Sequence, residues 1–210
     1  MTVGALQRAI DRAADRRSGV VERCGLCAAA VAEGHRHVLD KRDDTPMCVC
    51  TACTLLFDRD GAGGGQYRLI PTRRLRLAGL STEPLGVPVG IAFFVKHHDG
   101  RVVAHYPSPL GGTRSEVDPV AWTGVEAASP GLAGMRPAVE ALLVRANREG
   151  GPTEHWILPV DACYRLVAVI RRHWTGMAGG AAVWREVARF FSELRPEELR
   201  QEEGPCHRSG

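Results

Sequence analysis

Residues 24–53 of the chain read CGLCAAAVAEGHRHVLDKRDDTPMCVCTAC, a stretch that begins and ends with Cys-x-x-Cys. Each pair presents two thiolates from one tight turn, and the 22 residues between Cys27 and Cys50 are enough for a small ribbon that brings the turns together. Four thiolates complete the closed tetrahedron of structural Zn²⁺ and leave no position for a substrate. We therefore predict a zinc-ribbon-like module over residues 20–60, with the metal ligands Cys24, Cys27, Cys50 and Cys53.

Paired cysteines also occur as disulfides in secreted proteins and as redox dithiols. The first 23 residues lack the apolar core and the small-residue cleavage site of a secretory signal. No run in the chain approaches the roughly 18 apolar residues of a membrane span. We therefore expect a cytoplasmic protein without a membrane partner, in which this cysteine spacing favours metal binding over disulfides.

The identity of the metal is a separate question, because iron in a rubredoxin-like site uses the same four thiolates. Turns that hold iron usually carry glycine or proline near their second cysteine, whereas the turns here read Cys-Gly-Leu-Cys-Ala and Cys-Thr-Ala-Cys-Thr. These residues supply little of the close backbone approach that tunes an iron–sulfur centre. We therefore expect Zn²⁺ and keep iron as the alternative.

Three further residues in this stretch are candidates for the site. In an extended segment Cys48 and Cys50 point to the same face, so Cys48 could replace Cys50; the two-residue gap favours Cys50 because both turns then match. His35 and His37 share a face, either with a metal or proton-transfer role or as polar side chains on the outside of a ribbon strand, and we favour the second interpretation. Cys163 on an apolar helix stripe and Cys206 in a polar tail are expected outside the site.

The rest of the sequence predicts an α+β fold. Residues 1–19 carry an amphipathic pattern typical of a helix, 61–66 are a glycine-rich linker, 67–196 form the α+β domain, and 197–210 are expected to be a disordered tail. Two amphipathic helices at the end of this domain are expected to pack on one face of an antiparallel sheet. Strands are predicted at 67–70, 89–95, 102–106, 139–145 and 153–159, and helices after Asp118, Ser129, Asp161 and Gly180.

The sequence contains no nucleophile elbow, zincin helix, dinucleotide fingerprint or P-loop. We therefore expect no enzyme; a cleft at His155 or Tyr164 is the alternative that would change this expectation. Asp161 already has a structural role as a helix cap. The net charge of +3 is ordinary and the arginines after the linker lack interleaved aromatic residues, so nucleic acid is not the expected partner.

Several strings together resemble a bacterial family. They are Cys24-Gly-Leu-Cys27, His35-Arg-His37-Val-Leu-Asp40, Cys48-Val-Cys50-Thr-Ala-Cys53, Tyr106-Pro-Ser-Pro109, His155-Trp156, Pro159-Val-Asp161-Ala-Cys163 and His173-Trp174 with Gly179-Gly180. The family is an uncharacterised, actinobacterial-type domain of unknown function encoded near nickel–iron hydrogenases, and the likeness covers residues 22–195. The resemblance implies a role in maturing, docking or wiring the hydrogenase, and it carries over no catalytic residue.

Together these observations predict a zinc-binding accessory protein that binds a protein partner. The resemblance implies a hydrogenase subunit or maturation factor as that partner. A rubredoxin-like electron carrier with iron at the same cysteines is the alternative.

Overall fold

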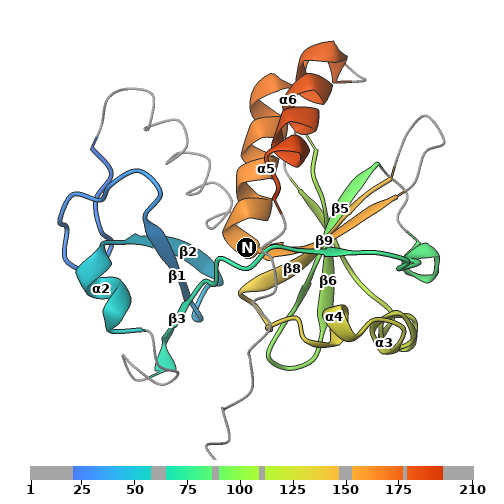
Figure 1. Ribbon diagram of the computed structural model, residues 1–210, viewed down its shortest axis with the longest axis horizontal. Helices are drawn as coiled ribbons and strands as arrows, with labels where there is room; N and C mark the ends of the chain where they lie inside the picture. The colour runs from blue at the N-terminus through green and yellow to red at the C-terminus, as the bar shows by residue number, and fades with distance from the viewer. Residues whose placement is uncertain are drawn as a thin grey trace, which may run out of the picture.

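Two antiparallel sheets organise the part of the chain that the structure describes (Figure 1). The structure is a computed structural model, and it describes residues 21–57, 65–86, 90–108, 112–146, 153–176 and 179–195. A small sheet has the strand order β2-β1-β3, and a large sheet has the order β4-β9-β8-β5-β6-β7. The predicted α+β class with an antiparallel sheet is confirmed. The predicted helix over 1–19, most of the glycine-rich linker, and the tail with Cys206 lie outside the described residues.

The small sheet contains a hairpin between the two cysteine pairs. β1 (Arg36–Asp40) and β2 (Thr45–Val49) form an antiparallel hairpin, and β3 (Tyr67–Leu69) pairs with the other edge of β1. This pairing corrects our expectation that the strand at 67–70 opens the larger α+β unit. The strand closes the small sheet because Val38 and Leu69 are partners across the ladder and belong to the same small core. The boundaries of the predicted domains stay a prediction.

The large sheet contains the four other predicted strands and two that the sequence did not indicate. β5 (Ile91–Lys96) and β6 (Val102–Tyr106) form the predicted hairpin, whose turn includes Gly100 at φ 87°. β8 (Glu140–Arg145) and β9 (Glu154–Pro159) pair in the centre. The edge strands β4 (Leu75–Leu77) and β7 (Thr113–Glu116) escaped prediction because they are short, and all four side chains of β7 are exposed.

Helices cover both faces of the large sheet (Figure 1). The face that receives Phe93 is covered by two helices, α5 (Val160–His173) and α6 (Gly180–Ser192). The face that receives Phe94 is covered by α3 (Pro119–Ala127), α4 (Pro130–Ala133) and the 3₁₀-helix η2 (Glu83–Leu85). Our expectation of helices on one face was therefore incomplete. Strand β5 is apolar from Ile91 to Val95 because consecutive side chains enter two different cores.

Local start signals account for two of the helices. The carboxylate of Asp118 accepts from the backbone N–H of Val120 and Ala121, and the hydroxyl of Ser129 accepts from the N–H of Leu132, each with proline as the next residue. The expected cap at Asp161 is wrong. Helix α5 begins at Val160, which places Asp161 inside the first turn, where its side chain is available for a different contact.

At least three kinds of contact attach the small sheet to the large one. Leu39 of β1 and Ile70 after β3 belong to the hydrophobic core under α5 and α6. In the connection that follows, Arg73 forms a two-pronged ion pair with the fully buried Glu140, with Nε–Oε1 3.0 Å and Nη2–Oε2 2.8 Å. The third contact joins hairpin turns: Nδ1 of His97 lies 3.5 Å from a carboxylate oxygen of Asp44.

Among the described residues, no helix has the length and apolar character needed to cross a membrane.

Candidate metal centre

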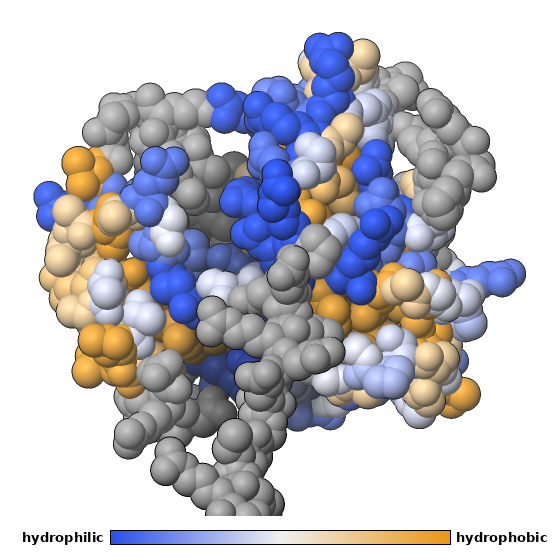
Figure 2. Space-filling model, viewed as in Figure 1, coloured by the Kyte–Doolittle hydropathy of each residue, from blue (hydrophilic) through white to orange (hydrophobic). Residues whose placement is uncertain are grey.

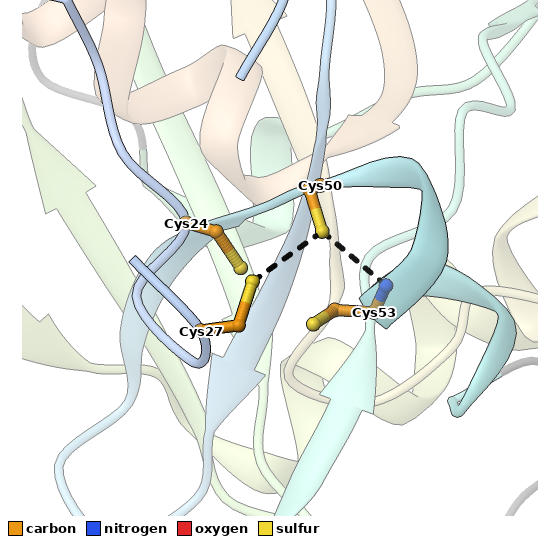
Figure 3. Close-up of side chains that lie close together, drawn as sticks. All are labelled: Cys24, Cys27, Cys50 and Cys53. Atoms are coloured by element: carbon orange, nitrogen blue, oxygen red, sulfur yellow. Dashed lines mark hydrogen bonds between the residues drawn. The ribbon is translucent and has the colours of Figure 1, made fainter. Parts of the chain in front are cut away.

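Four cysteine side chains from two distant turns converge at one end of the small sheet (Figure 3). The Sγ atoms of Cys24, Cys27, Cys50 and Cys53 all lie within 4.8 Å of one another. The Sγ atoms of Cys27 and Cys50 are 3.7 Å apart. A Zn–S distance of about 2.3 Å in a tetrahedron corresponds to a sulfur–sulfur edge of about 3.8 Å, whereas a disulfide requires about 2.05 Å. The spacing between the turns therefore suits tetrahedral coordination.

The first turn is shaped by its own backbone and by strand β2. The N–H of Cys24 donates to the carbonyl of Ala29 at 2.7 Å, and the N–H of Ala28 donates back to the carbonyl of Cys24 at 2.8 Å. Ala28 accommodates the reversal with φ 60°. The N–H of Gly25 donates to the carbonyl of Cys48 at 2.8 Å, which fixes this turn beside the end of β2.

The second turn is the start of a short helix, α2 (Thr51–Leu55). Cys50 is its N-cap residue, in extended conformation with φ −73° and ψ 165°, and its Sγ accepts from the N–H of Cys53 at 3.5 Å (Figure 3). The N-cap position places the Cys50 sulfur next to the free N–H groups of the first helical turn. The helix therefore turns Cys53 back toward Cys50 and toward the first pair.

The thiols of this cluster titrate differently. Burial raises the pKa of Cys24, but hydrogen bonds from the backbone of Cys50, Cys27 and Leu26 outweigh it and lower that pKa to about 6. Burial, together with hydrogen bonds to the other three cysteine side chains, raises the pKa of Cys53 to about 12. For Cys27, a backbone hydrogen bond from Ala29 lowers the pKa, and contacts with Cys24 and Cys50 outweigh it, so the net shift is upward. A divalent cation bound by all four sulfurs would require each of them to be deprotonated.

The donor set fits a closed metal site. Cys24 and Cys53 are buried beside Val38, Val49 and Phe57, and in the part of the chain that the structure describes these five make up the buried part of the small core. A core of this size stabilises a fold weakly, and small modules of this kind usually depend on a metal or a disulfide. The four cysteines could therefore bind one metal ion, and the structure leaves its identity open.

The three additional candidates from the sequence form a group of their own. Cys48 does not join the four-sulfur cluster; one donor atom each of His35, His37 and Cys48 lie within 4.8 Å of one another. His37 Nδ1 also donates to Oδ2 of Asp161 at 2.9 Å. Burial lowers the pKa of His37, but the hydrogen bonds to Asp161 and Cys48 outweigh it and raise that pKa to about 9. The favoured interpretation of both histidines as outward-facing polar residues is wrong, since the His35 side chain is only 6% exposed and the His37 side chain, 19% exposed, contacts Asp161 of α5.

Sequence reasoning missed the role of Asp161, which it assigned as a helix cap. The signal was present in the sequence only as an acidic residue at a helix start, and its partner lies more than a hundred residues earlier in the chain. The contact between His37 and Asp161 depends on how the small sheet docks against α5, and no pattern of neighbouring residues in the sequence predicts that docking.

The remaining candidates lie apart from both clusters. His155 is buried, and its Nε2 lies 3.1 Å from the hydroxyl of Thr82. Tyr164 lines a cavity of about 10 Å³ beside Phe93 and His105, which has room for about one water molecule. His155 and Tyr164 therefore do not share a cleft. Cys163 is buried in the core under α5, as expected.

Comparison with known proteins gives a family and no closer relative. No curated protein and no solved structure matches the chain significantly. Residues 23–198 match the family described as Family of unknown function (DUF5947), a range that includes both cysteine pairs and all the helices and strands described above. Because the match covers most of its length, the chain belongs to this family of unknown function.

Proposed function

We propose that the protein is a zinc-binding accessory protein, in which a zinc-ribbon-like site holds a surface that binds a protein partner. The observation that carries the proposal is the convergence of four thiol sulfurs in a closed group, in which the Sγ atoms of Cys27 and Cys50 are 3.7 Å apart. Zn²⁺ with four cysteine ligands has no open position for substrate, so its role is to stabilise the fold around it. The function then depends on the surface beside the metal.

That surface contains two exposed leucines. Leu55, the last residue of α2, is 72% exposed, and the following Leu56 is 62% exposed. Leu55 and Leu56 lie two and three residues after Cys53 in the chain, so a metal at the cluster would hold them in place. Hydrophobic residues gather at the left edge of Figure 2, over the part of the molecule where Figure 1 places α2. Neighbouring exposed apolar side chains are typical of a protein-binding surface.

The family resemblance inferred from the sequence supplies the first partner to test, a nickel–iron hydrogenase subunit or a maturation factor of that enzyme. The proposed role is assembly or docking of the hydrogenase. Two leucines beside a rigid metal site suit a small hydrophobic contact surrounded by polar residues, and such contacts are usually dominated by a few side chains.

Binding to purified hydrogenase subunits, measured by surface plasmon resonance with the metal-loaded full chain, tests the proposal. We expect saturable binding that the double substitution Leu55→Ser/Leu56→Ser weakens by about tenfold or more. Val120→Ser is the matched control, because Val120 is 79% exposed on α3 of the large unit. Equal binding by the double variant, or no binding by the wild type, would reject the partner surface.

Metal analysis of protein purified under reducing conditions tests the site itself. Cys24→Ser and Cys53→Ser should each lower the zinc content, whereas Cys163→Ala, which removes a buried cysteine of α5, should leave it unchanged.

Iron at the same four sulfurs is the second candidate, which would make the protein a rubredoxin-like electron carrier. It is favoured by the exposure of Cys27, since an electron carrier needs a sulfur edge near its partner. A red protein whose absorption is bleached by dithionite would decide for iron. Colourless protein with stoichiometric zinc would decide against it.

A further inference from the structure

We propose that His35, His37 and Cys48 form a second metal site, which holds one late first-row divalent cation of the zinc class through two imidazoles and one thiolate. The donor atoms of the three side chains lie within 4.8 Å of one another. This site is separate from the four-sulfur cluster and does not depend on the function proposed above.

The hairpin of the small sheet brings the three side chains together. His37 and Cys48 are directly opposite each other in the β1–β2 register, so their side chains lie side by side on one face. His35 precedes His37 by two residues, and its ring lies against the ring of His37 with centroids 4.8 Å apart. Leu39, two residues further along the same face, enters the core under α5. Val38 and Val49, on the opposite face, pack with Cys24 and Cys53. The two groups of donors therefore lie on opposite faces of one hairpin.

Both histidine rings are held in the way that metal-binding histidines are usually held. The Nδ1 of His35 donates to the carbonyl of Ala32 at 2.9 Å, and the Nδ1 of His37 donates to the carboxylate of Asp161 at 2.9 Å. A histidine that binds a metal through one nitrogen commonly donates the other N–H to a carbonyl or a carboxylate, which fixes its tautomer and its orientation. With both Nδ1 atoms engaged, each ring has Nε2 left to offer to a metal.

The Nε2 of His35 is the observation that requires a ligand. Its side chain is only 6% exposed, and within the described residues this nitrogen is buried without any hydrogen-bond partner. Buried polar atoms in proteins are nearly always satisfied, so an unpartnered ring nitrogen next to a thiol and a second imidazole calls for a bound species. Because the donor set contains nitrogen and sulfur, it suits Zn²⁺ and similar ions rather than Ca²⁺ or Mg²⁺, which prefer oxygen.

The second site differs from the first in having an open coordination position. In a tetrahedral zinc site, ligands of these types are about 3.3–3.6 Å apart, so a modest contraction of the three side chains would enclose the ion. Three protein ligands leave one position for water or for a donor atom from another molecule. Asp161 lies behind His37 and acts as a positioning residue. The site lies where the small sheet meets α5 (Figure 1), so the ion would also stabilise this junction.

Metal stoichiometry of the full chain tests the site. Protein stripped with a chelator under reducing conditions is reloaded with Zn²⁺, and bound metal per chain is counted after removal of excess. We expect two ions for the wild type, and one ion for His35→Ala and for Cys48→Ser. The control His98→Ala, which removes an exposed imidazole from the β5–β6 turn, should keep two. Cys24→Ser should lose the ion of the four-sulfur cluster and keep the other.

Two results would overturn the proposal. One is a wild-type protein that binds a single ion and loses it in Cys24→Ser, which decides the question even if the His35 and Cys48 variants fail to fold. The other is an unchanged stoichiometry in both His35→Ala and Cys48→Ser. A further measurement addresses Asp161: Asp161→Asn should weaken the affinity of the second ion by about 10–100-fold and leave the first unchanged. Loss of zinc from Cys24→Ser alone concerns only the four-sulfur site, so failures of the two proposals are distinguishable.

Discussion

Removal of the Arg73 guanidinium should destabilise the protein through a single buried carboxylate. Glu140 has no exposed surface, and its two oxygens receive Arg73 Nε at 3.0 Å and Nη2 at 2.8 Å. The N–H of Arg136 also donates to Oε2 at 2.8 Å, so one hydrogen bond remains after the arginine is removed. Breaking a buried ion pair from one side costs about 3–5 kcal/mol. Because Arg73 is 31% exposed and one donor remains, we expect Arg73→Met to lose about 3 kcal/mol, the lower end of that range.

Urea unfolding of the metal-loaded protein, followed by tryptophan fluorescence, measures this loss. A loss of about 3 kcal/mol corresponds to a fall in Tm of about 6–12 °C for a chain of this size. Arg101→Met is the matched control, because Arg101 and its partner Asp99 are each more than half exposed; we expect no measurable change. If the cost comes from an uncompensated charge, adding Glu140→Gln to Arg73→Met should restore more than about 1 kcal/mol. A loss below about 1 kcal/mol, or no recovery in the double variant, would refute the reasoning.

Three further predictions concern the cluster and a buried histidine. Cys53→Ser should abolish protection from amide exchange in the first cysteine turn and in α2 while β5 and β8 stay protected, measured by mass spectrometry; full protection in α2 would contradict a metal-dependent fold of this end of the small sheet. Zinc binding to the stripped protein at neutral pH should release about two protons or more, because the pKa of Cys27 is raised and that of Cys53 is about 12. The affinity for zinc should therefore rise with pH. Binding heats that do not depend on the ionisation enthalpy of the buffer, measured by calorimetry, would argue against this proton release. Burial, with smaller contributions from nearby positive charges, lowers the pKa of His105 from 6.5 to about 3. The folded state then binds fewer protons than the unfolded state, so the contribution of His105 to the free energy of unfolding is complete above pH 6.5 and is lost progressively as pH falls toward 3. At pH 5 the loss is about 2 kcal/mol. His105→Phe should remove this part of the pH dependence of Tm in thermal unfolding.

Much of the local structure was predictable from the sequence. The hairpin at Asp99-Gly100, the capped starts at Asp118 and Ser129, and the buried stripe of α5 all follow from signals within a few residues. The central strands β8 and β9 were equally clear, because each contains an apolar run, residues 141–144 in β8 and 156–159 in β9. Strands β4 and β7 were not, since each is short and takes its structure from the neighbouring strand to which it bonds.

The candidate site was likewise predictable from the sequence only in part. The spacing of two Cys-x-x-Cys pairs indicated a four-sulfur cluster because each turn presents its own two sulfurs, and those sulfurs are found together. The face of the hairpin that Cys48 occupies depended on the register between β1 and β2. Its partner across the hairpin is His37, and the chain turns into α2 at Cys50, which separates two cysteines that a longer strand would have kept on one face.

From its residues alone, the chain specified the turns, caps and apolar strands, since these interactions join neighbours whose geometry is set by a few backbone angles. The contacts of His37 with Asp161 and of Arg73 with Glu140 were decided by tertiary packing, across separations of 124 and 67 residues. A charged side chain finds a partner at that distance only after the sheets have docked, and burial then makes the pairing strongly preferred. Hydrophobic periodicity reports which face of an element is buried, but not which element covers it.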